Sequence, residues 1–242
     1  MEDQTHLQHD AARTIERFFS ETGPTYDQVV SLFTLGIDRF WKKKMLAALP
    51  AAPMRVLDLA CGTGILTFAI AAKYPQCHVT GVDISRGYLD VARAKAAATM
   101  QDNVTLLHQR AEDFKSVLPF DAVTASYLPK YADLDRLIGN VSAMLLPGGV
   151  VIFHDFTYPT YRLLQKTFAY YFKILQVLGS AWYPEWKAVF FDLPEVIRKT
   201  DWVSEGVVAM KRHGLDDIRV TSLTLQGAAL ITARKPLPHG EV

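Results

Sequence analysis

The sequence predicts an α/β fold, in which helices pack on one mostly parallel sheet of seven strands that ends in an antiparallel hairpin. Two observations predict this fold class. Between residues 55 and 154, short apolar runs alternate with longer helical patterns, which is typical of right-handed βαβ units in a doubly wound sheet. The last part of the chain instead alternates apolar and polar residues on both sides of Gln226-Gly227, as a two-stranded hairpin does.

The parallel part of the sheet is expected to contain five buried strands, because each is a short apolar run. They are residues 55–59, 78–82, 104–108, 122–127 and 150–154. The helices expected between them are residues 64–74, 86–100 and 133–145. A helical pattern over residues 10–49, interrupted at Gly23-Pro24 and Gly36, precedes the sheet, and residues 50–53 form a short linker.

The C-terminal part breaks this alternation. Residues 158–180 predict a long aromatic-rich helix, and residues 182–202 are dense in Trp, Tyr and Phe. Residues 203–213 predict a further helix, which Gly214 would end. The two strands of the hairpin are expected at residues 218–225 and 228–233.

Composition excludes several classes of protein. The 242 residues are 50% hydrophobic, which is enough for a sizeable core, and the net charge of +1 does not suggest a nucleic-acid partner. Two cysteines, Cys61 and Cys77, cannot form a disulfide framework and suit a reducing cytoplasm. Residues 1–10 lack the apolar core of a signal peptide, and no window is apolar enough to span a bilayer. We therefore expect a soluble cytoplasmic protein; peripheral membrane contact and a homodimer remain open.

A glycine-rich loop follows the first predicted strand, with the sequence Asp58-Leu59-Ala60-Cys61-Gly62-Thr63-Gly64. A strand, a Gly-x-Gly turn and a helix together present backbone N–H groups at the carboxyl edge of a sheet. Glycine lets the backbone approach a ligand closely. Asp83 ends the second strand, where its carboxylate can accept hydrogen bonds from both hydroxyls of a ribose. A Gly-x-Gly alone could be a tight turn, but this combination predicts a site for an adenosyl ligand.

Two details favour S-adenosylmethionine over a dinucleotide. The dinucleotide fingerprint has a third small residue three positions after the second glycine, where this chain has Thr67. Asp58 can hold the ammonium of a bound amino acid, which S-adenosylmethionine carries. We expect the loop and the ends of neighbouring strands to contribute the cofactor-binding residues Asp58, Ala60, Cys61, Gly62, Gly64, Asp83, Ile84 and Ser126.

The adenine pocket is expected in the loop after the third strand, residues 110–113. The backbone N–H of Ala111 is a candidate donor to the adenine ring, and the carboxylate of Glu112 can accept from its amino group. The alternative is an ordinary exposed loop or a helix N-cap.

Several motifs carry a family resemblance over nearly the whole chain. Some are general: the glycine loop, Gly81-Val82-Asp83, and Leu146-Pro147-Gly148-Gly149. More specific are Tyr26-Asp27 and Leu-Gly-Ile-Asp-Arg-Phe-Trp-Lys at residues 35–42. The chain thereby resembles the UbiE-type ubiquinone/menaquinone C-methyltransferases, a family of class I S-adenosylmethionine-dependent methyltransferases. The resemblance implies a Rossmann-like class I methyltransferase sheet, places Tyr26 over the cofactor, and implies quinone biosynthesis.

The sequence departs from that family on the acceptor side. Residues 127–131 are Tyr-Leu-Pro-Lys-Tyr, where the family typically carries Gly-Leu-Arg-Asn-Val. The family's Tyr-Arg-Tyr-Leu is replaced by Phe191-Asp192-Leu193. We therefore expect a divergent acceptor site. A separate departure lies in the adenine loop, where Arg110 occupies a position at which aspartate is common.

The acceptor is expected beyond the carboxyl ends of the fourth and fifth strands, near the candidate catalytic residues Tyr127, His154 and Asp155. If the nucleophile is a phenol or hydroquinol carbon, a base must take or share the hydroxyl proton. His154 is the natural choice, with Asp155 orienting it or acting alone. A lone histidine at a strand end can equally be structural. The aromatic residues after residue 155 would enclose an apolar pocket; a plain core or a dimer interface is the alternative.

The expected organisation is a single domain over residues 1–242. It comprises an N-terminal helical cap (1–49), a cofactor-binding core (50–155), an aromatic-rich helical lid insertion (156–202) and a terminal helix and hairpin (203–242). The expected function is S-adenosylmethionine-dependent methyl transfer to a small apolar aromatic molecule, such as a quinol-type C-methylation. O-methylation of a phenolic metabolite, a nucleotide-dependent oxidoreductase and a binding module without catalysis remain alternatives. No cluster has the spacing of metal ligands, so no metal is expected.

Overall fold

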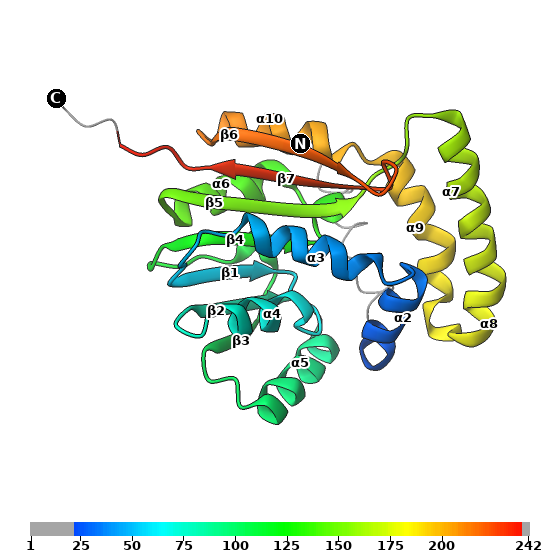
Figure 1. Cartoon of the computed structure of the whole chain (residues 1–242), viewed down its shortest axis with the longest axis horizontal. Coiled ribbons are helices and arrows are strands. Elements are labelled where there is room, and N and C mark those ends of the chain that lie inside the picture. Colours follow the sequence, from blue (N-terminus) through cyan, green and yellow to red (C-terminus); the bar gives the residue numbers. More distant parts are fainter. Residues whose placement is uncertain (1–21, 239–242) are drawn as a thin grey trace.

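The computed structural model describes residues 22–238, and its centre is one seven-stranded sheet (Figure 1). The strand order is β3-β2-β1-β4-β5-β7-β6. The five parallel strands are β1 (Arg55–Leu59), β2 (His78–Asp83), β3 (Val104–His108), β4 (Phe120–Ser126) and β5 (Leu145–Phe156). The two antiparallel strands are β6 (Asp216–Leu223) and β7 (Ala228–Arg234). The predicted fold class is confirmed.

Helices precede and connect the strands. They are α2 (Tyr26–Phe33), α3 (Ile37–Ala48), α4 (Ile65–Lys73), α5 (Arg86–Thr99), α6 (Leu134–Met144) and α10 (Trp202–Arg212), with 3-10 turns η1 (Gly23–Thr25), η2 (Ala111–Asp113) and η3 (Pro129–Tyr131). The break between α2 and α3 occurs at Gly36, whose φ of 75° favours glycine, as the sequence predicts. The part of the predicted N-terminal helix at residues 10–21 lies outside the described residues. No described helix is both long and apolar enough to cross a bilayer.

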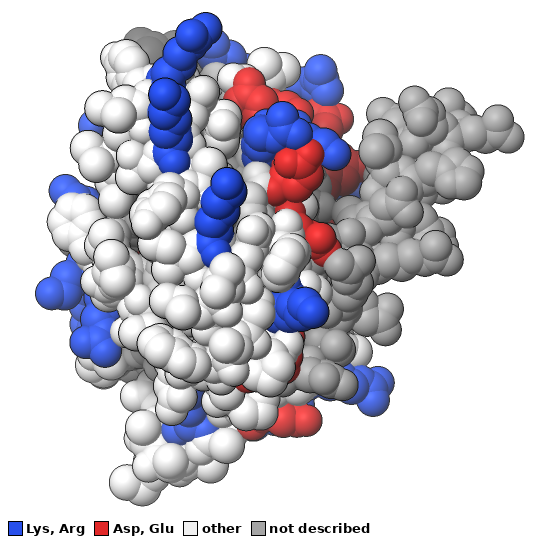
Figure 2. Space-filling model, turned by 90° about the vertical axis from the view of Figure 1, so that its right-hand side faces the viewer, with Lys and Arg blue, Asp and Glu red and all other residues white. Residues whose placement is uncertain are grey.

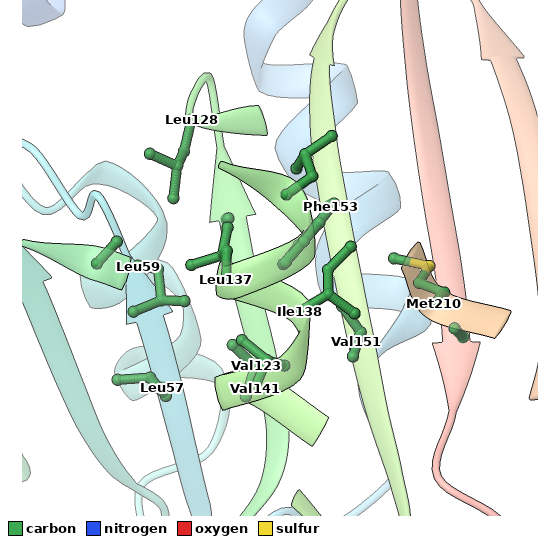
Figure 3. Close-up of a cluster of buried hydrophobic side chains, with 14 of the residues drawn as sticks. Leu57, Leu59, Val123, Leu128, Leu137, Ile138, Val141, Val151, Phe153 and Met210 are labelled. Atoms are coloured by element: carbon green, nitrogen blue, oxygen red, sulfur yellow. The ribbon is translucent and has the colours of Figure 1, made fainter. Parts of the chain in front are cut away.

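The hydrophobic core has one layer on each face of the sheet. On one face, Leu57, Val123 and Phe153 pack against Leu137 and Met210, which come from α6 and α10 (Figure 3). On the other face, α3 and α4 pack on the alternate residues of the same strands. Because successive strand residues point to opposite faces, a buried strand such as β1 packs against both layers at once.

A helical segment lies beyond the carboxyl ends of the parallel strands (Figure 1). It contains α7 (Arg162–Ile174), a π-helical turn η4 (Leu175–Gly179), α8 (Ser180–Trp182), η5 (Pro184–Trp186) and α9 (Lys187–Lys199). Buried side chains from α2 and this segment form a third hydrophobic cluster, made of Val29, Phe172, Leu175, Trp186, Val189, Phe190 and Ile197. The predicted aromatic-rich segment is therefore packed over the end of the sheet.

Two details of this segment were not part of the sequence prediction. The first helix begins at Arg162 rather than at residue 158, because Pro159 disfavours helical geometry at the residue before it. The second helix, α9, lies in the segment expected as a helical lid without stated helix bounds, and it contains Pro194 in its interior. Pro194 lacks the N–H that would bond the carbonyl of Phe190, and Gln176 Nε2 donates to that carbonyl instead at 3.3 Å.

The terminal hairpin turns earlier than predicted. Three consecutive residues, Thr224, Leu225 and Gln226, have φ of 43°, 53° and 65°, so the turn begins before the predicted Gln226-Gly227. Contacts with distant segments hold this strained turn: Trp41 Nε1 donates to Thr224 Oγ1 at 2.8 Å, and Thr160 Oγ1 donates to Gln226 Oε1 at 2.9 Å. The turn is thereby fixed beside α3 and the start of the lid.

Candidate active site

The glycine loop leaves β1 through an unusual backbone. Ala60, Gly62 and Gly64 all have left-handed φ, of 53°, 56° and 85°. A Cβ at Gly64 would lie 2.3 Å from the ring of Phe68, so a larger residue does not fit there. The loop then enters α4 at the carboxyl edge of the sheet, where the sequence predicts the adenosyl site.

Asp58 is buried behind this loop and held by two hydroxyls. Thr67 Oγ1 donates to one carboxylate oxygen at 2.6 Å, and Thr124 Oγ1 donates to the other at 2.7 Å. Burial raises the pKa of Asp58 to about 6, although both hydroxyls favour its charged form. Thr67, which the sequence marks only as a departure from the dinucleotide fingerprint, therefore orients the carboxylate predicted to hold an ammonium.

Asp83 closes the loop from the end of β2. Its two oxygens accept hydrogen bonds from the backbone N–H groups of Gly62 and Ser85, both at 2.7 Å. Burial raises its pKa, and these two backbone donors act in the opposite direction. Each carboxylate oxygen can accept more than one hydrogen bond, so Asp83 keeps acceptor capacity for ribose hydroxyls.

A small polar cavity of about 30 Å³ lies between the loop and α2. Its walls include the predicted residues Tyr26, Asp58, Ala60, Cys61, Gly62, Ser126 and Tyr127. They also include Asp38 and Lys42, which the sequence analysis did not single out. Both lie in the specific motif at residues 35–42, which was the available signal for them.

Helix α2 covers the glycine loop and is tied to it. The carboxylate of Asp27 accepts hydrogen bonds from Thr63 Oγ1 at 2.6 Å and from Lys95 Nζ at 2.5 Å. Lys95 Nζ also donates to the carbonyl of Thr63 at 3.0 Å. Beside this contact, the ring of Tyr26 packs against Tyr88, with the centroids 5.0 Å apart. Tyr26 thus lies over the loop, in the position that the family resemblance implies.

A chain of hydrogen bonds leads away from the polar cavity. Lys42 Nζ donates to Asp38 at 3.0 Å and to Ser126 Oγ at 2.6 Å, and Ser126 Oγ lies 3.0 Å from His154 Nδ1. The hydroxyl of Tyr127 also donates to Asp38, at 2.6 Å. One buried network therefore joins α3 to the ends of β4 and β5.

His154 lies at the inner end of this network. Its side chain is fully buried against Trp41 and Tyr127, and its Nε2 makes no hydrogen bond to a described residue. Burial lowers the pKa of His154 well below its usual range, and the nearby ammonium groups of Lys42 and Lys130 lower it further. His154 lines neither cavity described here, so the structure separates it from the position expected for a base that contacts the acceptor.

The predicted adenine loop forms the short helix η2. Ala111 and Glu112 are buried, and Arg110 Nε lies 3.8 Å from the Glu112 carboxylate. Ile84 is partly exposed beside them, where its carbonyl is 2.8 Å from His108 Nε2. Gly64, Asp83, Ile84, Ala111 and Glu112 line neither cavity, so the two cavities do not include the adenosine half of the predicted cofactor site.

A second, larger cavity of about 310 Å³ adjoins the polar one beneath the lid. Its walls are almost entirely apolar and come from α2, α7, α9 and the hairpin turn; they include Phe33, Phe156, Phe168, Phe172, Trp186 and Phe190. Tyr26, Val30 and Tyr127 line both cavities. Leu35 and Leu225 also line the larger one and are 79% and 76% exposed, so they mark its opening to the surface.

Asp155 does not orient His154, contrary to the expectation. The two are consecutive residues of β5, so their side chains point to opposite faces of the sheet. Asp155 instead forms a buried ion pair with Lys130, with Nζ and Oδ1 2.6 Å apart. Lys130 was not among the predicted site residues. The only signal for it in the sequence was its position in the divergent segment at residues 127–131.

Comparisons with known proteins agree on one family. The model of the ubiE/COQ5 methyltransferase family matches residues 6–235. A demethylmenaquinone methyltransferase of Thermus thermophilus is 30% identical over 224 residues, which cover 90% of this chain and all of the relative. A demethylmenaquinone methyltransferase of Deinococcus radiodurans is 30% identical over 177 residues, covering 71% of this chain and 72% of the relative.

Solved structures share the fold at low sequence identity. The geranyl diphosphate C-methyltransferase of Streptomyces coelicolor, in a complex that includes S-adenosyl-L-homocysteine, superposes with a TM-score of 0.60 and 15% identity. The superposition covers 81% of this chain and 76% of that chain.

Proposed function

The chain belongs to the ubiE/COQ5 methyltransferase family, and on that premise we propose that it transfers the methyl group of S-adenosylmethionine to a small apolar aromatic acceptor, by quinol-type C-methylation. The observation that carries the proposal is the polar cavity adjoining a larger apolar one, with Tyr26, Val30 and Tyr127 in both walls. Such an arrangement suits a polar methyl donor beside an apolar acceptor. A nucleotide-dependent oxidoreductase, which the sequence left as an alternative, does not fit this family.

The polar residues fit S-adenosylmethionine by their charges. Its amino-acid end carries one ammonium and one carboxylate, and the polar cavity offers the carboxylate of Asp58 and the ammonium of Lys42. Asp83 would accept the ribose hydroxyls, and the η2 loop with Ala111 and Glu112 would hold the adenine. The bound cofactor supplies an electrophilic methyl group on a sulfonium; the residues of this chain bind it, align it and exclude water.

The larger cavity supports an apolar aromatic acceptor. Its volume of about 310 Å³ lies at the lower end of the roughly 300–1,000 Å³ that is common for small-molecule sites. Its walls exclude water, which strengthens the few polar interactions inside. The two relatives named above are demethylmenaquinone methyltransferases, which favours a quinol over other aromatic molecules.

The three candidate catalytic residues would have different roles. Tyr127 lines both cavities and stacks on Phe156, with ring centroids 4.9 Å apart, so it would orient the acceptor toward the methyl group. His154 would act through Ser126, which it holds beside Lys42. Asp155 would act through Lys130, with which it forms its ion pair.

We expect methylated product when the full chain is incubated with isotopically labelled S-adenosylmethionine and a panel of quinols and phenols, followed by mass spectrometry. A label on ring carbon of a quinol supports the proposal. A label on oxygen of a phenol would replace C-methylation by O-methylation. Absence of any labelled product, with S-adenosylmethionine binding confirmed by calorimetry, would leave a binding protein without catalysis.

We also propose that the outer face of the lid contacts a membrane surface. Between Asp155 and Glu185 the chain has no acidic residue but carries Arg162, Lys166 and Lys173. The same stretch exposes large apolar side chains: Leu163 is 75%, Tyr170 69%, Val177 70% and Trp182 65% exposed. Figure 2 shows this side of the molecule as mostly uncharged surface with separate basic side chains. Apolar area combined with basic charge is typical of segments that lie on anionic lipid.

A further inference from the structure

The apolar cavity contains one charge. Among the described residues that line it, Lys130 is the only one with a formally charged side chain. Lys130 belongs to η3, directly after β4, and its side chain is 2% exposed. Burying an isolated ammonium in apolar surroundings is unfavourable. An ammonium in the wall of the apolar cavity therefore needs a partner of opposite charge, and its presence there indicates a functional role.

Asp155 is that partner, and its carboxylate accepts three hydrogen bonds. Its carboxylate accepts from Lys130 Nζ at 2.6 Å, from the backbone N–H of Lys130 at 3.1 Å and from the backbone N–H of Phe156 at 2.7 Å. Asp155 itself does not line the cavity. The pair therefore presents its cation, and not its anion, to whatever occupies the cavity.

The ammonium of Lys130 keeps one donor available. It donates to Asp155 and, at 3.2 Å, to the carbonyl of Tyr127, which accounts for two of its three N–H groups. Nζ also lies 4.4 Å from the ring centroid of Tyr131, a contact that stabilises the cation without consuming a hydrogen bond. The third N–H has no partner among the described residues, and Lys130 lines the cavity together with Tyr127, the residue that borders the polar cavity.

We infer that Lys130 is the acceptor-binding residue: its ammonium holds the ionised oxygen of a phenol, quinol or enol, while Asp155 positions the ammonium and receives the acceptor's proton. This inference rests on the proposed methyl transfer, because it names the class of acceptor for the same cavity. Acceptors of the same shape without an ionisable hydroxyl, such as aryl ethers, would bind poorly.

The ionisation of the acceptor is balanced within the Lys130–Asp155 pair, and the ring proton that C-methylation later displaces leaves to water. The acceptor's O–H proton passes to Lys130 Nζ as Lys130 releases a proton to Asp155 along their 2.6 Å hydrogen bond. Before the step the acceptor carries a neutral hydroxyl, Lys130 is an ammonium and Asp155 is a carboxylate. After the step the acceptor is an oxyanion, Lys130 is again an ammonium and Asp155 is a neutral carboxyl group, so the total charge is unchanged. Burial raises the pKa of Asp155 and lowers the pKa of Lys130, and both shifts favour a proton on Asp155. The oxyanion increases the electron density on the adjacent ring carbons, which makes them better nucleophiles.

The test uses 4-nitrophenol, whose absorbance changes when it ionises. We expect the full chain to bind it and to lower the pKa of the bound probe by about one unit or more, because an ammonium in contact favours the oxyanion. Lys130→Arg should retain most of this shift. Lys130→Met combined with Asp155→Asn should abolish it; this double variant removes both charges and so leaves no unpaired buried ion.

Controls separate folding and cofactor binding from this role. Lys187→Met, an exposed lysine on α9, should leave the shift unchanged. Circular dichroism melting verifies that the double variant folds, and calorimetry verifies that it still binds S-adenosylmethionine. Failure of the wild type to bind the probe, an unshifted pKa of the bound probe, or a shift that survives in the double variant would overturn the inference. If the wild type shifts the probe but does not bind S-adenosylmethionine, the proposed function fails and the oxyanion site stands.

Discussion

At the residue scale, the carboxylate of Asp58 must be charged to hold the ammonium of the cofactor, yet it lies in a buried position where a charge destabilises the fold. It is buried, and two threonine hydroxyls fix its oxygens without neutralising the charge. Its raised pKa means that the folded protein binds the proton of Asp58 more tightly than the unfolded chain does. Keeping Asp58 ionised therefore lowers the free energy of unfolding, a cost that is common for charged groups in binding sites.

Asp58→Asn should therefore stabilise the fold while it weakens cofactor binding. With a folded pKa of about 6 against 3.8 for an unperturbed aspartate, ionised Asp58 opposes folding by about 3 kcal/mol above pH 6, and this penalty disappears as the pH falls toward 4. Urea unfolding at about pH 7.5 should show the variant as more stable than the wild type, and the difference should shrink at about pH 4.5. A difference that does not change with pH would contradict the assignment.

The sequence could predict Asp58 and Asp83 because each ends a buried strand next to the glycine loop, so its surroundings follow from the local pattern. It could not predict Lys42 and Lys130 in the same way. Lys130 meets Asp155 from another strand, and Lys42 meets Ser126 across 84 positions of the chain. Contacts of this kind depend on how the elements pack and leave no local pattern.

At the element scale, α2 is the part of the structure that closes the polar cavity. Tyr26 and Val30 of α2 line that cavity, and Asp27 ties the helix to the loop through Thr63 and Lys95. At about 30 Å³ the cavity is small even for the amino-acid end of the cofactor, so we expect α2 to move when the cofactor enters. The Asp27 contacts are then made again when the helix closes.

Asp27→Ala should increase the dissociation rate of S-adenosylmethionine by about fivefold, since it removes roughly 1 kcal/mol of partly exposed charged contact from the closed form. Stopped-flow measurement of tyrosine and tryptophan fluorescence can follow this release. Asp90→Ala is a matched control, because Asp90 lies on α5 and its ion pair among the described residues is with Arg93 at the surface. An unchanged rate in Asp27→Ala would mean that α2 is held by its apolar contacts alone.

Elements with a clear local pattern were predicted well from the sequence. The strands at residues 55–59 and 104–108 have the predicted bounds, because short apolar runs between helices leave few other choices. Helix α9 lies in the predicted helical lid, but its bounds were not predicted, because the amide of Gln176 that compensates for Pro194 comes from η4, outside that helix. The hairpin turn was misplaced because Trp41 and Thr160, which hold it, lie far away in the chain.

At the scale of the whole molecule, the opening of the acceptor cavity lies next to the apolar face of the lid. Leu35 and Leu225 mark the opening, and α7 lines the cavity with its inner side while it exposes Leu163 and Tyr170 on its outer side. An apolar acceptor dissolved in a membrane could then pass into the cavity without crossing water.

We expect the protein to sediment with vesicles that contain anionic lipid and to remain free with neutral vesicles. Lys166→Glu and Lys173→Glu should each weaken this binding by roughly fivefold or more, from about 1 kcal/mol per basic residue near a charged surface. Lys211→Glu, on α10 away from the lid, serves as control. A stable dimer in analytical ultracentrifugation, disrupted by these two lid variants, would instead assign the face to a second copy of the chain.

The shared wall between the two cavities has a kinetic consequence. Tyr26, Val30 and Tyr127 form part of both, so the acceptor's enclosure is complete only after α2 has closed over the methyl donor. We therefore expect turnover to follow a compulsory order, in which the donor enters first and its demethylated product leaves last. An accumulating demethylated donor would thereby slow the enzyme directly, so that the rate follows the methylation potential of the cell rather than the supply of acceptor alone.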